Sequence, residues 1–220
     1  VTPNCVYSIF EDDRGDFWYG TSNFGLFIER STGELEFYLD EMNRPSVKAI
    51  QQFGDYVYVG HAGGFSMYDL INERFVSIEK FYSNTGLLKG KFINYFYKLK
   101  NGAIIVGTEK SGAFVLGSDQ KIKQFANTHD LDVPNVRAVY QDSLGNVWMG
   151  TYGNGLLFKG QDADTVAIIS DVDGLYDNVV SAIVEDGSSL YMTCNKGLFR
   201  VSIADLYGFL RGEKSRIYSE

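Results

Sequence analysis

The chain has 220 residues, of which 45% are hydrophobic and 15% aromatic, so it can bury one sizeable core in which strands are favoured. Its net charge is −8 and it shows no cluster of Lys and Arg, which argues against nucleic acid or an anionic membrane surface as a partner. No run of about 18 apolar residues occurs, so we expect membrane attachment only through segments outside this chain.

Strands and turns alternate in the first forty residues. The stretch VYSIFED, residues 6–12, alternates in polarity and is predicted to form an innermost strand. The turn DRGD leads to a second strand, FWYGTS, and the turn NFG leads to a third, LFIER. The turn STGE then leads to a fourth strand, LEFYL. This succession predicts one four-stranded antiparallel unit.

The same succession recurs along the chain. One anchor is the Gly-Thr corner that ends the second strand, found at Gly20, Gly60, Gly107, Gly150 and, in degenerate form, Thr193. A second anchor is the start of the first strand, found at Val6, Val47, Ile93, Val136 and Val180. Successive anchors are 40 to 47 residues apart. A period in the low forties with strands throughout predicts an all-β β-propeller made of four-stranded blades.

The predicted propeller region is 1–202, with blades at residues 6–46, 47–92, 93–135, 136–179 and 180–202. The fifth copy ends after its third strand. Five blades could close a small ring, but the start at Val1 reads as cut, so we expect an open arc or part of a larger propeller. Leu206, Phe209 and Leu210 then lie three and four residues apart, which predicts a short amphipathic helix over 203–212. The helix and tail, 203–220, are expected to lead to a following domain.

The repeated GT…GL pattern is first of all a packing signature. We expect the corner glycines to let strands approach the next blade, the Trp to fill the space between blades, and the Thr to bond across the corner. The second copy departs most from this pattern, since it has a Tyr in place of Trp and His61 in place of Thr.

Three stretches closely resemble the two-component-regulator propeller repeat: EDDRGDFWYGTSNFGLF, QDSLGNVWMGTYGNGLLF and VEDGSSLYMTCNKGLFRVS. The connectors NTGLLKGKFIN, NTHDLDVPNV and DVDGLYDNVV are similar to that family's lead into each blade. The resemblance covers nearly the whole chain, and its specificity comes from five copies in series.

The resemblance implies the sensor region of a membrane-anchored two-component protein, outside the cytoplasmic membrane and thus periplasmic. In the family, an immunoglobulin-like domain, a transmembrane helix and a histidine kinase or diguanylate cyclase commonly follow. Relatives in gut bacteria of the Bacteroides type bind oligosaccharides. We therefore expect an oligosaccharide or another small ligand, no catalytic residues, no cofactor, no metal and no nucleic acid, with a homodimer left open.

A ligand is expected on the face formed by the loops between second and third strands and by the connectors into the first strands. Rings can stack on sugars there, and amides can bond hydroxyls. The candidate ligand-binding residues are Asn23, Phe24, Arg44, His61, Glu109, Lys110, Tyr152, Asn154, Tyr176, Asn195 and Lys196.

Other signals do not support chemistry. The acids at 11–13, 142 and 185–186 recur at one turn position, and turn chemistry explains them better than a metal does. His61 and His129 lack metal-ligand spacing. A disulfide between Cys5 and Cys194 stays open.

Two other function classes remain. A glycosidase or lyase would need two carboxylates converging on the ligand face, and Glu109 is the only acid in the short loops. A protein-interaction or dimerisation scaffold would need no small ligand. Glycan binding separates the sensor from the scaffold, and turnover would identify an enzyme.

Overall fold

The structure is a computed structural model, and it describes residues 5–39, 46–125 and 135–220. Contacts divide the chain into two compact units, each described by itself below. Unit 1 comprises residues 1–98, 102–106 and 115–123, and unit 2 comprises 99–101, 107–114 and 124–220.

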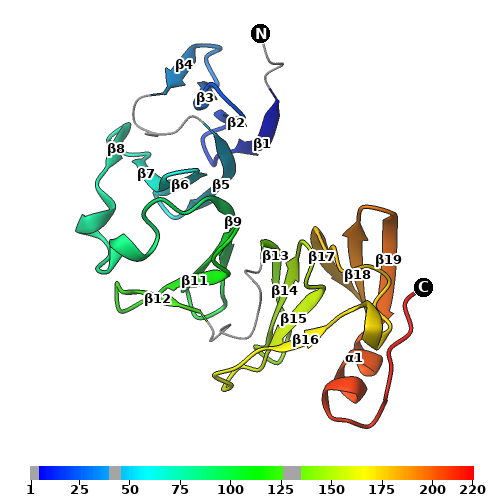
Figure 1. Ribbon diagram of the computed structural model, residues 1–220. Coiled ribbons are helices and arrows are strands. Elements are labelled where there is room, and N and C mark those ends of the chain that lie inside the picture. Colours follow the sequence, from blue (N-terminus) through cyan, green and yellow to red (C-terminus); the bar gives the residue numbers. More distant parts are fainter. Residues whose placement is uncertain (1–4, 40–45, 126–134) are drawn as a thin grey trace. The chain divides into compact units, whose positions relative to one another are not determined.

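Five antiparallel sheets follow one another along the chain (Figure 1). Within each sheet the strands pair in sequence order, and the sheets have four strands except the last, which has three. The first two sheets, in unit 1, contain β1 (Val6–Glu11), β2 (Phe17–Thr21), β3 (Leu26–Glu29), β4 (Leu35–Tyr38), β5 (Val47–Phe53), β6 (Tyr56–His61), β7 (Gly64–Asp69) and β8 (Arg74–Val76). The third sheet, which contributes residues to both units, contains β9 (Ile93–Lys98), β10 (Ile104–Thr108), β11 (Ala113–Leu116) and β12 (Ile122–Gln124).

The last two sheets lie in unit 2 and are followed by the only α-helix in the described part of the chain. Their elements are β13 (Val136–Gln141), β14 (Val147–Thr151), β15 (Leu156–Lys159), β16 (Ala167–Ile169), β17 (Ala182–Asp186), β18 (Ser189–Cys194), β19 (Gly197–Ser202) and α1 (Ile203–Leu210). In the described ranges, three 3-10 turns lie in connectors: η2 (Ile78–Lys80), η3 (Thr85–Leu87) and η4 (Asp171–Asp173). The predicted all-β propeller fold is confirmed, including the fifth copy that ends after its third strand.

The repeat extends to fine geometry. The register of the first two strands shifts between Val6 and Ser8, and it shifts at equivalent places between Val47 and Ala49 and between Val136 and Ala138. Such bulges bend the strand where they occur. The innermost strands of three blades therefore share the same bend.

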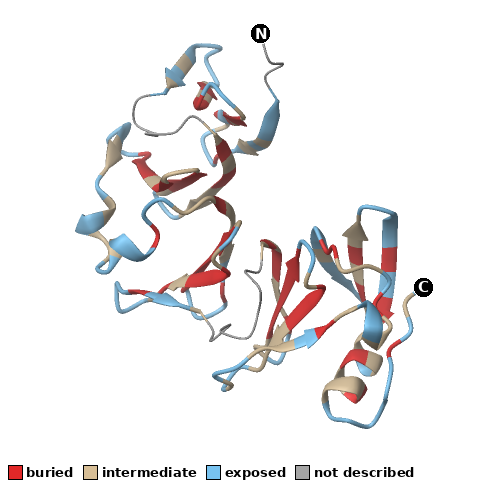
Figure 2. Ribbon diagram, viewed as in Figure 1, coloured by how far each residue is buried: buried red, intermediate tan, exposed pale blue. Residues whose placement is uncertain are grey.

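Each unit has a core that contains a tryptophan. Trp18 is fully buried in unit 1 and packs with residues of its own blade and of the next, among them Val47 and Tyr68. In unit 2, Trp148 packs in the same way with Val180 and Met192 of the fifth blade. Figure 2 shows the buried residues concentrated along the strands. The prediction that the tryptophans fill the space between blades is confirmed.

The strands of the first blade each end one residue before the predicted end, and two other element boundaries differ by two residues. Strand β17 begins at Ala182 instead of Val180, because the Val180 amide is already bonded to the Thr151 carbonyl oxygen of the preceding blade at 2.8 Å. Helix α1 ends at Leu210, two residues early, because Gly212 adopts a φ of +74° and its amide turns back to the Phe209 carbonyl.

The C-terminal end of the chain takes the place of a fourth strand in the last blade. Ser219 pairs with Val201 of β19 in an antiparallel bridge. Arg200 and Glu220 exchange two backbone hydrogen bonds, of 2.8 and 3.0 Å. The outer edge of this three-stranded sheet is therefore covered by the chain's own tail.

Candidate functional site

The corner residues between second and third strands have structural roles. A Cβ added to Gly20 would lie 2.8 Å from the Val47 carbonyl oxygen of the next blade, and one added to Gly150 would lie 2.5 Å from that of Val180. The Thr151 hydroxyl donates to the Gly155 carbonyl at 2.8 Å and accepts from the Asn154 amide at 3.0 Å. These contacts confirm the packing roles predicted for the glycine and threonine.

The turn acids bind the backbone and the tryptophan. Asp142 accepts bonds at Oδ1 from the amides of Leu144 and Asn146, and at Oδ2 from the Trp148 indole. Asp12 makes the equivalent contacts in the first blade. Among the described residues no group of three or more His, Cys, Asp or Glu could hold a metal ion. The turns account for Asp12 and Asp142 as predicted, whereas Glu185 and Asp186 lie in β17 and not in a turn.

His61 lies in the interior, where only 5% of it is exposed. Its Nδ1 accepts from the Gly63 amide at 3.1 Å, and its Nε2 lies 3.1 Å from the Ser66 hydroxyl. It therefore supports the corner as the threonine does in other copies. Burial lowers the pKa of His61 to about 4, so the ring is neutral at neutral pH. We correct its assignment as a surface ligand residue.

In unit 2 the loop face carries two half-exposed tyrosines. Tyr152, in the loop after β14, is 50% exposed, and the Arg137 guanidinium carbon lies 5.1 Å from its ring centroid. The Arg137 Nε donates to Asn135 Oδ1 at 3.1 Å. A planar cation held against an aromatic face fixes the orientation of both groups.

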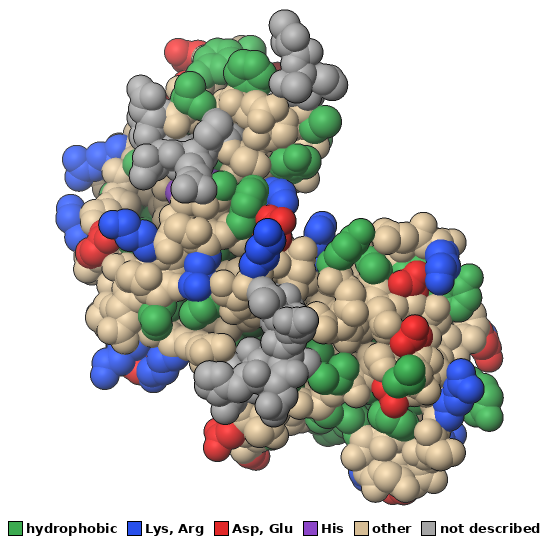
Figure 3. Space-filling model, in the orientation of Figure 1, with side chains coloured by type: hydrophobic (Ala, Val, Ile, Leu, Met, Phe, Trp, Pro, Cys, Tyr) green, Lys and Arg blue, Asp and Glu red, His purple; other side chains and the backbone are tan. Residues whose placement is uncertain are grey.

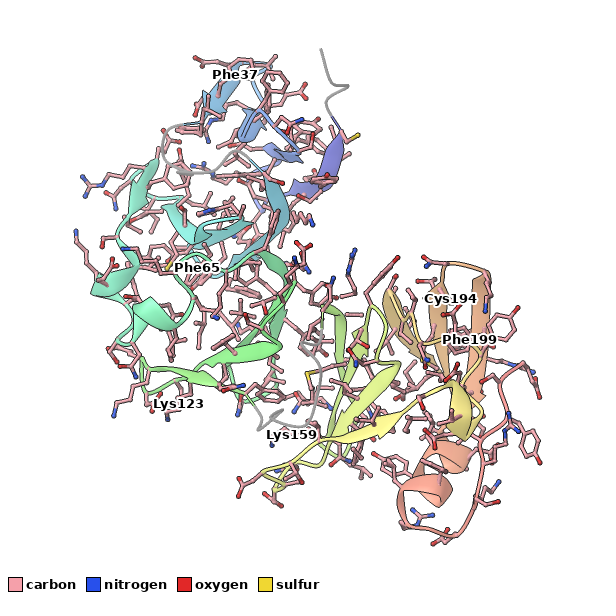
Figure 4. All side chains as sticks on the ribbon, in the orientation of Figure 1. Phe37, Phe65, Lys123, Lys159, Cys194 and Phe199 are labelled. Atoms are coloured by element: carbon pink, nitrogen blue, oxygen red, sulfur yellow. The ribbon has the colours of Figure 1, made fainter. Side chains whose placement is uncertain are left out.

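The second tyrosine, Tyr176, is also 50% exposed and lies in the connector into the fifth blade. The Lys196 ammonium lies 5.7 Å from its ring centroid and 3.4 Å from the Asp177 carboxylate. Tyr176 also packs against Phe199, which is labelled in Figure 4, with ring centroids 5.6 Å apart. The Val179 amide and Lys196 hold the pKa of Asp177 below its usual range, against the effect of burial.

One segment holds both aromatic positions in place. The Asn178 carbonyl oxygen accepts from the amides of Gly153 and Gly155, at 2.9 and 2.8 Å, and Tyr152 forms a bridge with Val179. The loop after β14 and the connector into the fifth blade thus lie side by side, as predicted for the ligand face. We call Tyr152, Arg137, Tyr176, Asp177 and Lys196 the aromatic face of unit 2.

The remaining candidates are placed as follows. Asn195 is exposed in the short loop before β19, and Asn154 is partly buried beside Tyr152. Lys110 is exposed and Glu109 partly buried in the loop after β10. Arg44 lies outside the described residues.

In unit 1, Asn23 and Phe24 are exposed in the loop after β2, and Phe24 is 49% exposed. The Lys48 ammonium lies 4.2 Å from the Phe92 ring centroid and 5.6 Å from that of Tyr7.

Unit 1 also contains a cavity of about 390 Å³ next to the short loop after β6. Its wall includes Gly63, Phe65 (labelled in Figure 4), Glu79, Thr85 and Lys89, so the long connector of residues 77–92 closes one side. The Ser77 and Thr85 hydroxyls approach the Glu79 carboxylate and keep its pKa low. The hydrogen bond from Ser77 has the larger effect. The cavity has the size of a small-molecule site.

Sequence reasoning missed Arg137, Asp177 and the cavity residues. Arg137 and Lys48 directly follow the strand-start anchors Val136 and Val47, so the repeat alignment contains a signal for them. The cavity depends on the path of a long irregular connector, for which the repeat gives no template.

On the face seen in Figure 3, Lys and Arg side chains are interspersed with Asp and Glu.

These observations define the class of protein: a set of β-propeller blades with a loop face on a rigid scaffold. The sequence profile described as two component regulator propeller matches residues 1–23 and 130–153. The predicted resemblance to this repeat is therefore confirmed over these two stretches. No curated protein sequence matches the chain.

Solved structures show the same fold. The extracellular domain of BT3049 from B. thetaiotaomicron, described as a hybrid two component system, is 23% identical with a TM-score of 0.73, and the match covers 91% of this chain and 27% of that one. The corresponding domain of BT4673 is 20% identical with a TM-score of 0.71, and the match covers 89% and 27%. Virginiamycin B lyase from Staphylococcus aureus is 11% identical with a TM-score of 0.67, and the match covers 90% and 66%.

At these identities the likeness concerns the fold alone. The chain spans about a quarter of the length of the two sensor domains. None of the helices in the described ranges is long and apolar enough to cross a membrane.

Proposed function

We propose that this chain is a ligand-sensing part of an extracytoplasmic, membrane-anchored two-component receptor, and that the aromatic face of unit 2 binds an oligosaccharide. In this proposal the region lies in the periplasm and the output domain, a histidine kinase or diguanylate cyclase, lies elsewhere in the protein. The match of residues 1–23 and 130–153 to the two component regulator propeller model supports this assignment. So does the likeness to domains described as extracellular parts of hybrid two component systems.

The observation that carries the proposal is the pair of half-exposed tyrosines. Tyr152 and Tyr176 each present a ring to solvent while a cation fixes the ring, and Asn178 ties their two segments together. Sugar rings stack on such faces, and the amides and cations nearby bond hydroxyl or carboxylate groups. A preformed site loses little ordering entropy on binding.

The single carboxylate of the aromatic face, Asp177, favours binding over hydrolysis. A glycosidase needs a protonated general acid as well as a second carboxylate. Asp177 is ion-paired with Lys196 and its pKa is lowered, so it is ionised at neutral pH and cannot serve as that acid. We therefore propose a binding region without catalysis.

Thermal unfolding against a panel of oligosaccharides tests the proposal. Ligand at 100 times its Kd adds about 2.7 kcal/mol of stability. For a chain of this size that raises the midpoint by about 2–4 °C per kcal/mol. A shift with one glycan class supports the sensor, whereas no shift across the panel moves the assignment to a protein-interaction or dimerisation scaffold. Cleavage of the bound glycan would overturn the non-catalytic assignment.

Variants locate the site. Tyr152→Ala and Tyr176→Ala should each weaken binding by about tenfold, since each removes one stacking surface. Tyr7→Ala is the matched control, because Tyr7 is 51% exposed, has a lysine ammonium 5.6 Å from its ring centroid and lies in unit 1, outside the aromatic face. Unchanged affinity in both aromatic-face variants would remove this site assignment even if a glycan binds.

A further inference from the structure

We infer that the connector between the fourth and fifth blades, residues 170–179, couples the aromatic face of unit 2 to the C-terminal tail. As a route for signalling this rests on the proposed function, because the ligand site is the one proposed above. The coupling itself is a physical property of the unliganded chain.

One end of the connector holds the ligand loop. The amides of Gly153 and Gly155 both donate to the Asn178 carbonyl. The Val180 amide donates to the Thr151 carbonyl at 2.8 Å. A shift of the connector therefore breaks the bonds that fix the loop carrying Tyr152.

The connector is internally braced. The Asp173 carboxylate accepts from both the amide and the hydroxyl of Ser170, each at 2.9 Å. The Asp171 amide donates to the Asn178 side chain at 2.9 Å, which closes the segment on itself. Leu175 is 3% exposed and anchors it in the unit 2 core. A segment with these bonds moves as one body.

The other end of the connector holds the tail. The Ile217 amide donates to the Asp173 carbonyl at 2.8 Å, and the Ser219 hydroxyl donates to the Gly174 carbonyl at 2.9 Å. Gly174 has a φ of +105°, and a Cβ there would lie 2.1 Å from the Ile217 carbonyl oxygen. Glycine is thus required at this position for the tail to lie against the connector.

The tail in turn completes the last blade, through the Arg200 and Glu220 bonds beside β19. A ligand that fixes Tyr152 and Tyr176 would stabilise the connector and, through it, the tail's place on the sheet. By reciprocity, loosening the tail must loosen the ligand loop. The described bonds of this path run from the connector to residues 217–219.

Amide hydrogen exchange of the unliganded chain tests the coupling. Gly174→Ala should push the tail off the connector, and exchange should become about five- to tenfold faster at Ile217 and Glu220 and also at Gly153 and Gly155. Gly187→Ala is the matched control, because Gly187 has a φ of +62° but open space around its Cα, and it should leave all four amides unchanged. Amides of β18 report whether the unit stays folded.

The inference fails if the tail amides speed up while the Gly153 and Gly155 amides do not, or if none of the four changes. If amide exchange in β18 also becomes faster, Gly174→Ala has unfolded unit 2. The coupling is then tested with Ser219→Ala instead. That variant removes one hydrogen bond without a clash and should give the same pattern at about two- to threefold. The exchange experiment contains no glycan, so it is independent of the binding experiment. If the amides respond together but no sugar binds, only the proposed function is refuted. If a sugar binds but the amides do not respond together, only this inference is refuted.

Discussion

The Trp148 indole N–H donates to the Asp142 carboxylate at 3.0 Å, and Trp18 donates to Asp12 at 2.9 Å in the first blade. In both blades the acid precedes the tryptophan by six residues. The same carboxylate caps the turn between the first two strands, so one acid fixes both the turn and the residue that fills the space between blades. Buried carboxylates with several donors are costly to alter.

Replacing Asp142 with Asn should destabilise unit 2 by about 2–4 kcal/mol. The amide keeps one acceptor for the turn amides but presents N–H groups where Trp148 and Tyr207 donate. Denaturant unfolding, monitored by amide hydrogen exchange in β14, measures the loss of stability of unit 2.

Asp12→Asn is the matched variant in unit 1 and should lower protection in β2 instead. The sole tryptophan of each unit, Trp18 or Trp148, reports its own environment by fluorescence. Equal stability of Asp142→Asn and the parent chain would show that the indole bond contributes nothing.

The blades were predictable because they repeat. Two anchors with one period fixed the strands, and the corner glycines lie where close packing demands them, as Gly150 against Val180 shows. The site was only partly predictable. Tyr152 and Tyr176 fall at repeat positions, but the partners that orient them, Arg137 and Asp177, are selected by three-dimensional contacts.

Residues in irregular or degenerate segments escaped prediction for physical reasons. His61 resembles a ligand residue in sequence, yet it occupies a threonine position whose side chain points into the corner. The tail at 217–220 has no blade pattern, because it is held by connector carbonyls and by the edge of β19 instead of by its own hydrophobic periodicity.

Gly150→Ala should destabilise unit 2 by about 2–3 kcal/mol, since the new methyl would lie 2.5 Å from a carbonyl oxygen and 2.7 Å from Val180 Cγ1. Gly160→Ala is its control, because the nearest atom there is 3.5 Å away. Its effect should stay within about 1 kcal/mol. Urea unfolding of the two variants compares them directly, and equal midpoints would refute the close-packing role of the corner.

Tyr207 of α1 extends the Asp142 cluster. Its hydroxyl donates to Asp142 and accepts from the Asn146 amide, and its ring lies 5.7 Å from that of Trp148. Burial, together with the bond to Asp142, raises the pKa of Tyr207 to about 12, so it stays a donor at neutral pH.

Tyr207→Phe keeps the ring packing and should cost about 1–2 kcal/mol. In the Asp142→Asn background the same change should cost less, because the charged acceptor is already gone. A double-mutant cycle by chemical unfolding measures the difference, and strict additivity would contradict a direct contribution of the hydroxyl to this cluster.

His61 makes the stability of unit 1 depend on pH. Burial holds its pKa at about 4 in the folded chain, against about 6.5 in the unfolded one. Between these values the unfolded state binds more protons, so stability is complete above about pH 6.5 and falls as the pH is lowered toward 4. The loss should reach about 3 kcal/mol at pH 4.

His61→Thr introduces the residue found at three of the other corners, where the hydroxyl bonds across the turn, and it removes the titrating group. The stability of unit 1 is measured by amide hydrogen exchange in β6 between pH 4 and pH 7. In the His61→Thr variant it should fall less toward pH 4 than in the parent chain. Carboxylates titrate in both proteins and cancel in the difference. An identical pH profile for the two proteins would mean that His61 binds its proton over the same pH range in the folded and unfolded chain. Its contacts argue against this, since protonation of Nδ1 would remove the acceptor of the Gly63 amide.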